Sequence, residues 1–274
     1  MTTAGNQYPL GSDPVELERL DHQGRMLAPA TRMLFEAAGV RRGMRVLDLG
    51  CGAGDVAFVL ADLVGDAGQV QGIDRSADAV GKATVRARQR QLERVRFTVG
   101  DITESAPGGP YDAIVSRLVL MYVSDPVAVL KTQSAVLRPG GIVAPIEFDI
   151  PAGGAVPSTP TVQRALSWIL EAFSRAGIHS ALGPRLWAVA RDAGLQPRGM
   201  LGVQLYFGPE DANGTALLAG IVRTLLPLLE RTGVATAAEV AVETLHQRMS
   251  EELAHAGAVF AFPTLVTAWA TRTS

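Results

Sequence analysis

The sequence is short of cysteine, aromatic residues, net charge and long apolar runs. Among 274 residues Cys51 is the single cysteine, which excludes an internal disulfide and points to a reducing compartment. Lys and Arg number 25 against 27 Asp and Glu, so the chain lacks the basic excess of nucleic-acid-binding proteins. Aromatic residues make up 5% of a chain that is 47% hydrophobic, a composition that would indicate a membrane protein only if its apolar residues ran together.

They do not run together at the length that a membrane requires. The longest apolar stretches, such as 114–123, are interrupted by charges like Arg117 and reach about half a bilayer span. The N-terminus carries Asp13, Glu16 and Glu18 instead of a basic segment followed by an apolar one, so it does not resemble a signal peptide. We therefore expect a soluble cytoplasmic chain.

Short apolar segments bounded by glycine alternate with amphipathic segments between residues 40 and 150. Their lengths and periodicities predict buried strands and helices respectively. The expected strands are 45–49, 70–73, 95–99, 113–116 and 142–147, with expected helices at 55–64, 77–92 and 127–137. This alternation indicates an α/β, doubly wound fold, in which helices cover both faces of a parallel sheet.

The alternation stops after Pro151. Residues 151–160 are rich in Pro, Gly, Ser and Thr, which is typical of a linker. Helices are expected at 162–176, 183–193, 211–230 and 237–256, and strands at 199–207 and 260–270. The predicted division is an N-terminal arm and helix (1–40), a sheet core (41–150) and a helical lid region with the last strands (151–274).

The most informative segment is a glycine-rich loop after the first expected strand. Gly50, Gly52 and Gly54 stand at alternate positions, where they let the backbone turn tightly and approach a ligand. The dinucleotide-binding pattern requires glycine where this chain has Asp55, and a carboxylate there repels a pyrophosphate. A P-loop is excluded because no Gly-Lys-Ser/Thr follows. The loop therefore predicts a ligand that lacks phosphate and carries positive charge.

Acidic residues follow the next two expected strands. Asp74 ends the second, where a carboxylate can accept both hydroxyls of a ribose. Asp101 follows the third, where it can accept from an exocyclic amine while Ile102 covers a purine face. An acidic residue after a strand is ordinarily a turn former or a helix cap. Together with the glycine loop, these acidic residues make three features at successive strand ends of one sheet, and such a combination indicates a ligand site.

With these motifs the sequence resembles the class I S-adenosylmethionine-dependent methyltransferases, in particular small-molecule enzymes related to the ubiquinone/menaquinone biosynthesis methyltransferases. The resemblance implies S-adenosylmethionine as cofactor and S-adenosylhomocysteine as product. It also implies a Rossmann-like seven-stranded sheet with an N-terminal helical segment and C-terminal helical lid insertions. The segments that carry it are VLDLGCGAGD (46–55), GIDRS (72–76), GDITE (100–104), YDAIVSRLVLMYVSDP (111–126) and LRPGG (137–141).

The resemblance also implies a set of cofactor-binding residues. The glycine loop packs against the methionine part of the cofactor, Asp74 holds the ribose, and Asp101 binds the adenine amine. Asp48 shapes the loop, and Arg117 lies near the methionyl end. Cys51 is expected to be a small buried residue of the loop and not a nucleophile. The complete expected set is Gln23, Asp48, Gly50, Cys51, Gly52, Asp74, Arg75, Asp101, Ile102, Ser116 and Arg117.

Methyl transfer from a sulfonium is a direct displacement, which requires in-line alignment and exclusion of water. It requires no metal, and no His, Cys and carboxylate cluster has metal-ligand spacing. The candidate catalytic residues are Tyr122, Glu147 and His179, which lie near the fourth and fifth strands or in the lid. The alternatives are packing for Tyr122, an exposed strand end for Glu147 and a solvated loop for His179.

The apolar lid helices predict a hydrophobic, aromatic or terpenoid-like small acceptor, since small-molecule pockets are mostly apolar. No nucleic-acid or membrane partner is expected, and a homodimer is a further expectation. Two alternatives stay open. One is a cofactor-binding protein or partner subunit that transfers no methyl group, and the other is a nicotinamide-dependent oxidoreductase, which Asp55 disfavours.

Overall fold

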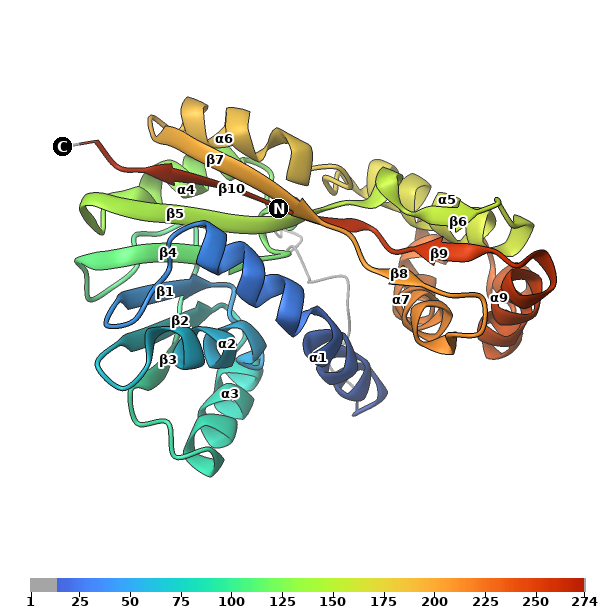
Figure 1. Ribbon diagram of the computed structural model, residues 1–274, viewed down its shortest axis with the longest axis horizontal. Helices are drawn as coiled ribbons and strands as arrows, with labels where there is room; N and C mark the ends of the chain where they lie inside the picture. The colour runs from blue at the N-terminus through green and yellow to red at the C-terminus, as the bar shows by residue number, and fades with distance from the viewer. Residues whose placement is uncertain (1–13, 274) are drawn as a thin grey trace, which may run out of the picture. The chain divides into compact units, whose positions relative to one another are not determined.

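The computed structural model describes residues 14–273, with side chains from Gly24 onward. Its main sheet has seven strands in the order β3-β2-β1-β4-β5-β10-β7 (Figure 1). The first five strands along the chain pair in parallel, whereas β10 is antiparallel to both of its neighbours. The strands are β1 (Arg45–Leu49), β2 (Gln69–Asp74), β3 (Val95–Val99), β4 (Tyr111–Arg117), β5 (Leu137–Asp149), β7 (Gln196–Val203) and β10 (Thr264–Thr271). The prediction of a doubly wound, seven-stranded Rossmann-like sheet is confirmed.

The strand order reverses between β1 and β4. The chain moves outward from β1 to β3 and then returns to β4 on the other side of β1. Ligands of open α/β sheets bind outside the carboxyl ends of the strands at such a reversal. The expected cofactor residues from Asp48 to Arg117 lie in or directly after the strands β1 to β4, whereas Gln23 lies in a helix.

Helices cover both faces of this sheet. The first face carries the C-terminal part of α1 (Pro14–Ala37), α2 (Asp55–Val64) and α3 (Ala77–Gln89). The second carries α4 (Pro126–Ser134) and α6 (Leu186–Asp192), which contact each other and, through α6, β10 (Figure 1). The core strands β1 and β4 are buried almost throughout, as strands covered on both faces should be.

The chain divides into two compact units, each described here by itself. The sheet unit comprises Gly24–Asp149, Ile178–Val203 and the chain from Thr264 onward. The helical unit comprises Ile150–Gly177, Gln204–Pro263 and the first part of α1. The three sequence segments proposed above remain a prediction.

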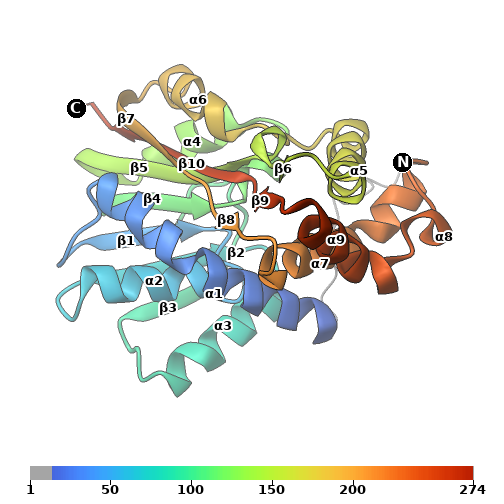
Figure 2. The same ribbon diagram turned by 45° about the vertical axis from the view of Figure 1, so that its right-hand side comes forward.

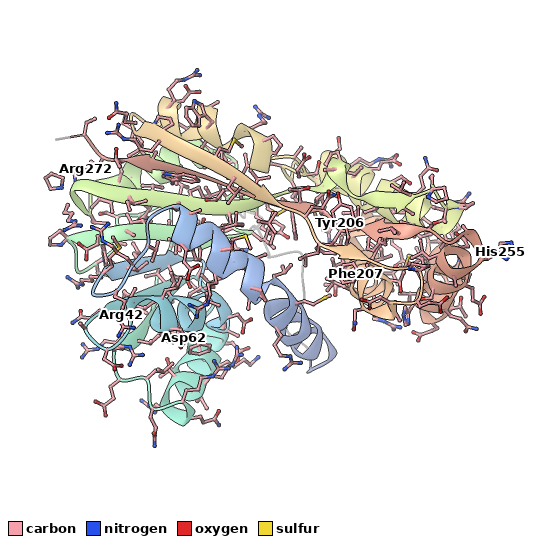
Figure 3. All side chains as sticks on the ribbon, viewed as in Figure 1. Arg42, Asp62, Tyr206, Phe207, His255 and Arg272 are labelled. Atoms are coloured by element: carbon pink, nitrogen blue, oxygen red, sulfur yellow. The ribbon has the colours of Figure 1, made fainter. Side chains whose placement is uncertain are left out.

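The helical unit packs three long helices with a small antiparallel sheet. Phe260 is fully buried there and stacks on Phe207, with ring centroids 6.2 Å apart. Tyr206, the residue before Phe207, lies on the opposite face of the small sheet and is 65% exposed (Figure 3). The elements are β6 (Gly154–Val156), α5 (Pro160–Ala176), β8 (Tyr206–Phe207), α7 (Ala212–Arg231), α8 (Ala237–Val240), α9 (Val242–Ala256) and β9 (Val259–Ala261) (Figure 2).

Two strands predicted as continuous are each divided between the units. The segment 199–207 forms part of β7 and then β8, and the segment 260–270 forms part of β9 and then β10. Pro263 lies between β9 and β10, where its missing N–H ends the strand ladder. Between β7 and β8 the Gln204 amide donates to the carbonyls of Ala152 (2.8 Å) and Phe262 (3.0 Å). These interruptions carry the chain from one sheet to the other.

Helix α7 qualifies as a membrane span by length and composition, with a mean hydropathy of 1.4. The sequence analysis did not identify this segment and gave 114–123 as an example of the longest apolar stretches. Half of the apolar window is buried inside the protein, where α7 contacts α5 and α9. In the described structure α7 is thus a core helix of the helical unit.

Candidate functional site

Three glycines shape the loop between β1 and α2. Gly50, Gly52 and Gly54 have φ values of 64°, 51° and 94°, which are left-handed conformations that favour glycine. At Gly50 the space is also closed, because a Cβ atom there would lie 2.6 Å from Cγ2 of Val119. The loop therefore needs glycine at Gly50 for two independent reasons.

Asp74, at the carboxyl end of β2, braces this loop. Its Oδ2 accepts the backbone N–H of Gly52 at 2.9 Å, and its Oδ1 accepts the N–H of Ser76 at 2.8 Å. Ser76 caps α3 by accepting the N–H of Ala79 at 3.2 Å. Each carboxylate oxygen has a second lone pair. Asp74 can therefore hold the loop and still accept hydroxyl groups from a ligand.

Asp101 and Ile102 follow β3 at the same edge of the sheet. Asp101 is exposed, and its Oδ1 accepts both the N–H and the hydroxyl of Thr103 at 2.8 Å each. These two hydrogen bonds hold the pKa of Asp101 below its ordinary value, with a smaller contribution from Arg75. Ile102 is half-buried, and its carbonyl accepts from the Gln133 amide at 2.7 Å. Asp101 therefore stays ionised at an accessible position.

Asp48 of β1, which is buried, and Arg117 of β4, which is half-buried, carry opposite charges on one face of the sheet. Asp48 of β1 is 1% exposed, and neither of its carboxylate oxygens has a hydrogen-bond partner among the described residues. Burial raises the pKa of Asp48 well above its ordinary value, and Arg117 opposes that rise. Asp48 pairs in register with Val115, which places Arg117 of β4 on the same face, two residues further on.

Among the described residues the Arg117 guanidinium has a single hydrogen-bond partner. It donates to the hydroxyl of Thr31 on α1 at 2.9 Å, and burial lowers its pKa. Beside it on β4, the buried hydroxyl of Ser116 has no partner among the described residues. Buried polar groups in proteins are nearly always hydrogen-bonded. Asp48 and Arg117 on one face of the sheet, and the buried Ser116 on the other, thus have unused bonding capacity near the glycine loop.

The structure corrects the reading of Asp55. Its carboxylate pairs with Arg86 at 2.8 Å, and Arg86 also donates to the carbonyl of Ala53 at 2.7 Å. The charge that was expected to repel a pyrophosphate is therefore offset by a guanidinium from α3. The argument against a dinucleotide loses this support. Arg86 stands 31 positions away on another helix, so no sequence pattern pointed to the pair.

Cys51 lies inside the loop as a small buried residue, as expected. A Cβ at Gly72 would lie 2.9 Å from its sulfur, so the thiol packs against the β2 backbone. Burial raises the pKa of the Cys51 thiol far above its ordinary range, which excludes an activated nucleophile. Among the described residues no group of three or more His, Cys, Asp or Glu could hold a metal ion.

The three candidate catalytic residues gather around η1 (Leu120–Tyr122), a 3₁₀ turn after β4 that contains Tyr122. His179 contacts this turn through its backbone N–H, which donates to the carbonyl of Met121 at 3.0 Å. The His179 Nε2 atom is buried and has no partner among the described residues. The sequence alone did not place residues 122 and 179 together.

Glu147 differs from the strand-end residue that the sequence suggested. It lies within β5, fully buried, and its Oε1 accepts the N–H groups of Val119 at 3.0 Å and Leu120 at 2.7 Å. Burial raises its pKa to about 8, although these backbone hydrogen bonds act in the opposite direction. The reading of Glu147 as a solvent-exposed strand end is wrong, because β5 continues to Asp149.

Other expectations have less support. Gln23 lies within α1, but its side chain is outside the described residues, and Arg75 is exposed. Most apolar residues expected to line an acceptor pocket form the cores of the two units, whereas Trp187 of α6 is 43% exposed. A shallow pocket of about 490 Å³ is lined by Arg248, Glu251, Glu252 and His255, all from α9 and none from the predicted site.

Known methyltransferases resemble part of this chain in sequence. The model of a methyltransferase domain family matches residues 41–173. The 2-phytyl-1,4-naphtoquinone methyltransferase of Synechococcus elongatus is 38% identical over 122 residues, covering 44% of this chain and 52% of that protein. The nocamycin O-methyltransferase of Saccharothrix syringae is 34% identical over 114 residues, covering 41% of each chain. This chain thus matches about half the length of these curated relatives, or less.

The crystal structure of the cyclase SpnF shares the fold over a larger part of the chain. It has a TM-score of 0.57 and covers 90% of this chain and 80% of its own, at 23% sequence identity. At this level of identity the likeness concerns the fold alone.

Proposed function

We propose that this chain, whose residues 41–173 match a methyltransferase domain family, is a class I S-adenosylmethionine-dependent methyltransferase that transfers a methyl group to a small organic acceptor. S-adenosylmethionine is its cofactor, and S-adenosylhomocysteine is the product. When bound, the cofactor supplies an electrophilic methyl group on a sulfonium. The residues of the sheet unit bind and orient it.

The observation that carries this proposal is the pair Asp48 and Arg117, which lie on one face of the sheet beside the glycine loop and have unused hydrogen-bonding capacity. The methionyl part of the cofactor ends in an ammonium and a carboxylate. Asp48 offers two unpartnered carboxylate oxygens, and Arg117 has guanidinium donors beyond the one used by Thr31. The ammonium of the cofactor can pair with Asp48 and its carboxylate with Arg117, since charges removed from water are ordinarily paired. Binding to Asp48 and Arg117 in this way does not require a phosphate group on the ligand.

The nucleoside part suits the adjoining strand ends. Asp74 retains lone pairs for the ribose hydroxyls while it braces Gly52. Asp101 is ionised and accessible, and so can accept from the adenine amine, with Ile102 beside it. Side chains from β1 to β4 thereby hold the whole cofactor along one edge of the sheet. Methyl transfer then depends on alignment of the acceptor, with water excluded from the sulfonium.

For the acceptor we propose a hydrophobic or aromatic small molecule, of the kind made in secondary metabolism. The names of the relatives support this class, because one acts on a phytylated naphthoquinone and the other on nocamycin. Tyr122 and His179 are the proposed contacts on the acceptor side. The unpartnered His179 Nε2 could accept a proton from a hydroxyl or amine acceptor.

The proposal is tested by transfer of a radiolabelled methyl group to a panel of phenols, quinols, indoles and amines. Incorporation into apolar members of the panel is the expected result. Binding of S-adenosylhomocysteine in calorimetry without any incorporation would favour the alternative, a cofactor-binding protein or partner subunit. The likeness to a cyclase shows that this fold does not by itself prescribe methyl transfer. Exclusive labelling of highly charged acceptors would contradict the acceptor class.

The remaining expectations join the proposal. We propose a cytoplasmic protein whose partner is the small acceptor, with no nucleic-acid or membrane ligand, and a homodimer in solution. Light scattering measures the mass of the assembly directly, and a monomer would overturn that last statement.

A further inference from the structure

The turn after β4 is held in a conformation that the backbone does not favour. Leu118 has a φ of 57°, in the left-handed region that non-glycine residues seldom adopt. Its N–H donates to the carbonyl of Ile146 on β5 at 2.8 Å. The N–H groups that follow, at the start of η1, have no carbonyl of their own turn to bind. The conformation of this segment therefore depends on partners from elsewhere.

Glu147, which lies inside the sheet, accepts the hydrogen bonds of these N–H groups. Its Oε1 accepts the N–H groups of Val119 and Leu120 at 3.0 and 2.7 Å. Its Oε2 is buried and has no partner among the described residues. Because leaving a buried oxygen without a hydrogen bond is unfavourable, packing alone does not explain a glutamate at this position. Its backbone neighbours on β5, Ile146 and Phe148, are apolar.

The segment held by Glu147 contacts both sides of the proposed site. Val119 packs against the glycine loop so closely that a Cβ at Gly50 would lie 2.6 Å from its Cγ2 atom. On the other side the Met121 carbonyl binds the N–H of His179 at 3.0 Å. One buried carboxyl group thus fixes a short segment that links the wall of the cofactor loop to the His179 backbone. All of these residues belong to the sheet unit.

We propose that Glu147 is a positioning residue, which holds the turn Leu118–Tyr122 and thereby sets where the acceptor stands relative to the methyl donor. The inference rests on the proposed function and assigns Glu147 a role other than proton transfer. The carboxyl acts through the backbone it binds and does not contact the acceptor. The role requires a hydrogen-bond-accepting oxygen at the end of a side chain of three carbons, the length of glutamate or glutamine.

Two variants separate this role from the others. Glu147→Gln keeps a carbonyl oxygen at the same reach, whereas Glu147→Asp keeps the carboxyl but withdraws it by one methylene. We expect E147D to lower kcat by at least tenfold while KM for the acceptor and Kd for S-adenosylhomocysteine change less than threefold. E147Q should keep kcat within about threefold of the unmodified protein.

Each other outcome overturns the assignment. A comparable loss of kcat in E147Q shows that Glu147 must ionise or transfer a proton. An unchanged kcat in E147D shows that the position of the oxygen is unimportant. If E147D loses thermal stability in parallel with E147Q, and kcat and KM do not separate, Glu147 has only a structural role.

A second measurement keeps this inference separate from the proposed function. Amide hydrogen exchange at Val119 and Leu120 should accelerate at least tenfold in E147D and change little in E147Q. If the unmodified protein methylates no acceptor, the proposed function fails, and this exchange still tests whether Glu147 holds the turn. Equal exchange rates in E147D and the unmodified protein would refute the positioning role.

Discussion

Asp74 shows how one side chain can brace a loop and keep hydrogen-bonding capacity for a ligand. The sequence predicted that Asp74 binds the ribose of the cofactor, and the alternative was that it forms a turn or caps a helix. The structure supplies the second function, since Asp74 accepts from Gly52 in the glycine loop and from Ser76 at the start of α3. The two readings are compatible because a carboxylate has four lone-pair sites and these contacts use two.

Replacement of Asp74 by alanine should weaken cofactor binding by at least about tenfold. Each charge-assisted hydrogen bond contributes about 1.5–3 kcal/mol, and 1.4 kcal/mol corresponds to a factor of ten. Calorimetric titration with S-adenosylhomocysteine measures the change. Asp78→Ala is the matched control, because Asp78 lies nearby on α3 and pairs with Lys82 at 2.6 Å on the surface. Equal dissociation constants for both variants would remove Asp74 from the site.

A second residue-scale prediction concerns two glycines with opposite environments. Gly50→Ala should lower the free energy of unfolding by about 1–3 kcal/mol, since Gly50 has a φ of 64° and lacks space for a Cβ. Gly81→Ala should raise it by about 0.5–1 kcal/mol, because Gly81 lies in α3 with no atom within 4 Å of the added carbon. Urea denaturation measures both, and stabilisation by G50A would contradict the loop geometry.

At the scale of elements, the turn η1 illustrates how a buried strand can control a loop. The sequence predicted a strand followed by an apolar segment within 111–126, and it predicted Glu147 at the end of another strand. Only strand pairing brings them together, since β4 and β5 lie side by side with Arg117 opposite Ile146. The next residue of β5, Glu147, then lies beneath the backbone that follows Arg117.

This burial makes stability depend on pH in a stated direction. Because burial raises the pKa of Glu147 to about 8 from an ordinary value of 4.5, the folded state retains a proton that the unfolded chain releases between these values. The free energy of unfolding should therefore fall as pH rises from 5 to 8, by up to about 1.4 kcal/mol per unit from this group.

Glu147→Gln removes that titration and no other. Denaturation at several pH values should show the variant gaining stability relative to the unmodified protein as pH rises. Asp48 and Asp149 also have raised pKa values, and their contributions persist in both proteins. A stability difference that stays constant from pH 5 to 8 would show that Glu147 is ionised throughout the range.

For the whole molecule, the binding of ligands distinguishes the cofactor classes that the sequence left open. The pairing of Asp55 with Arg86 weakens the charge argument against a dinucleotide, so this test matters more than the sequence suggested. A ligand that binds only the folded state stabilises it by about 2.7 kcal/mol at a hundred times its dissociation constant. S-adenosylhomocysteine should raise the melting temperature, whereas NADH at equal concentration should not. The reverse result would restore the oxidoreductase alternative.

The two-unit organisation also belongs to this scale. Periodicity correctly predicted helices in the C-terminal half, such as α5 and α7, and the strands that complete the sheet. It joined β8 to β7 and β9 to β10, because an apolar segment carries no mark of the sheet in which it pairs. The return of Ile178–Val203 to the sheet unit is decided by pairing between distant strands.

The sequence by itself determined the sheet, the glycine loop and the acidic residues at the strand ends. These features follow from local properties: the period of apolar residues, the conformational freedom of glycine and the place of a residue directly after a strand. The single cysteine correctly indicated a small buried residue. The tertiary structure decided the pairing of Asp55 with Arg86, the contact of Arg117 with Thr31 and the burial of Glu147 beneath η1. Each joins residues far apart in the chain, and their meeting depends on strand order and helix packing, which no local pattern specifies.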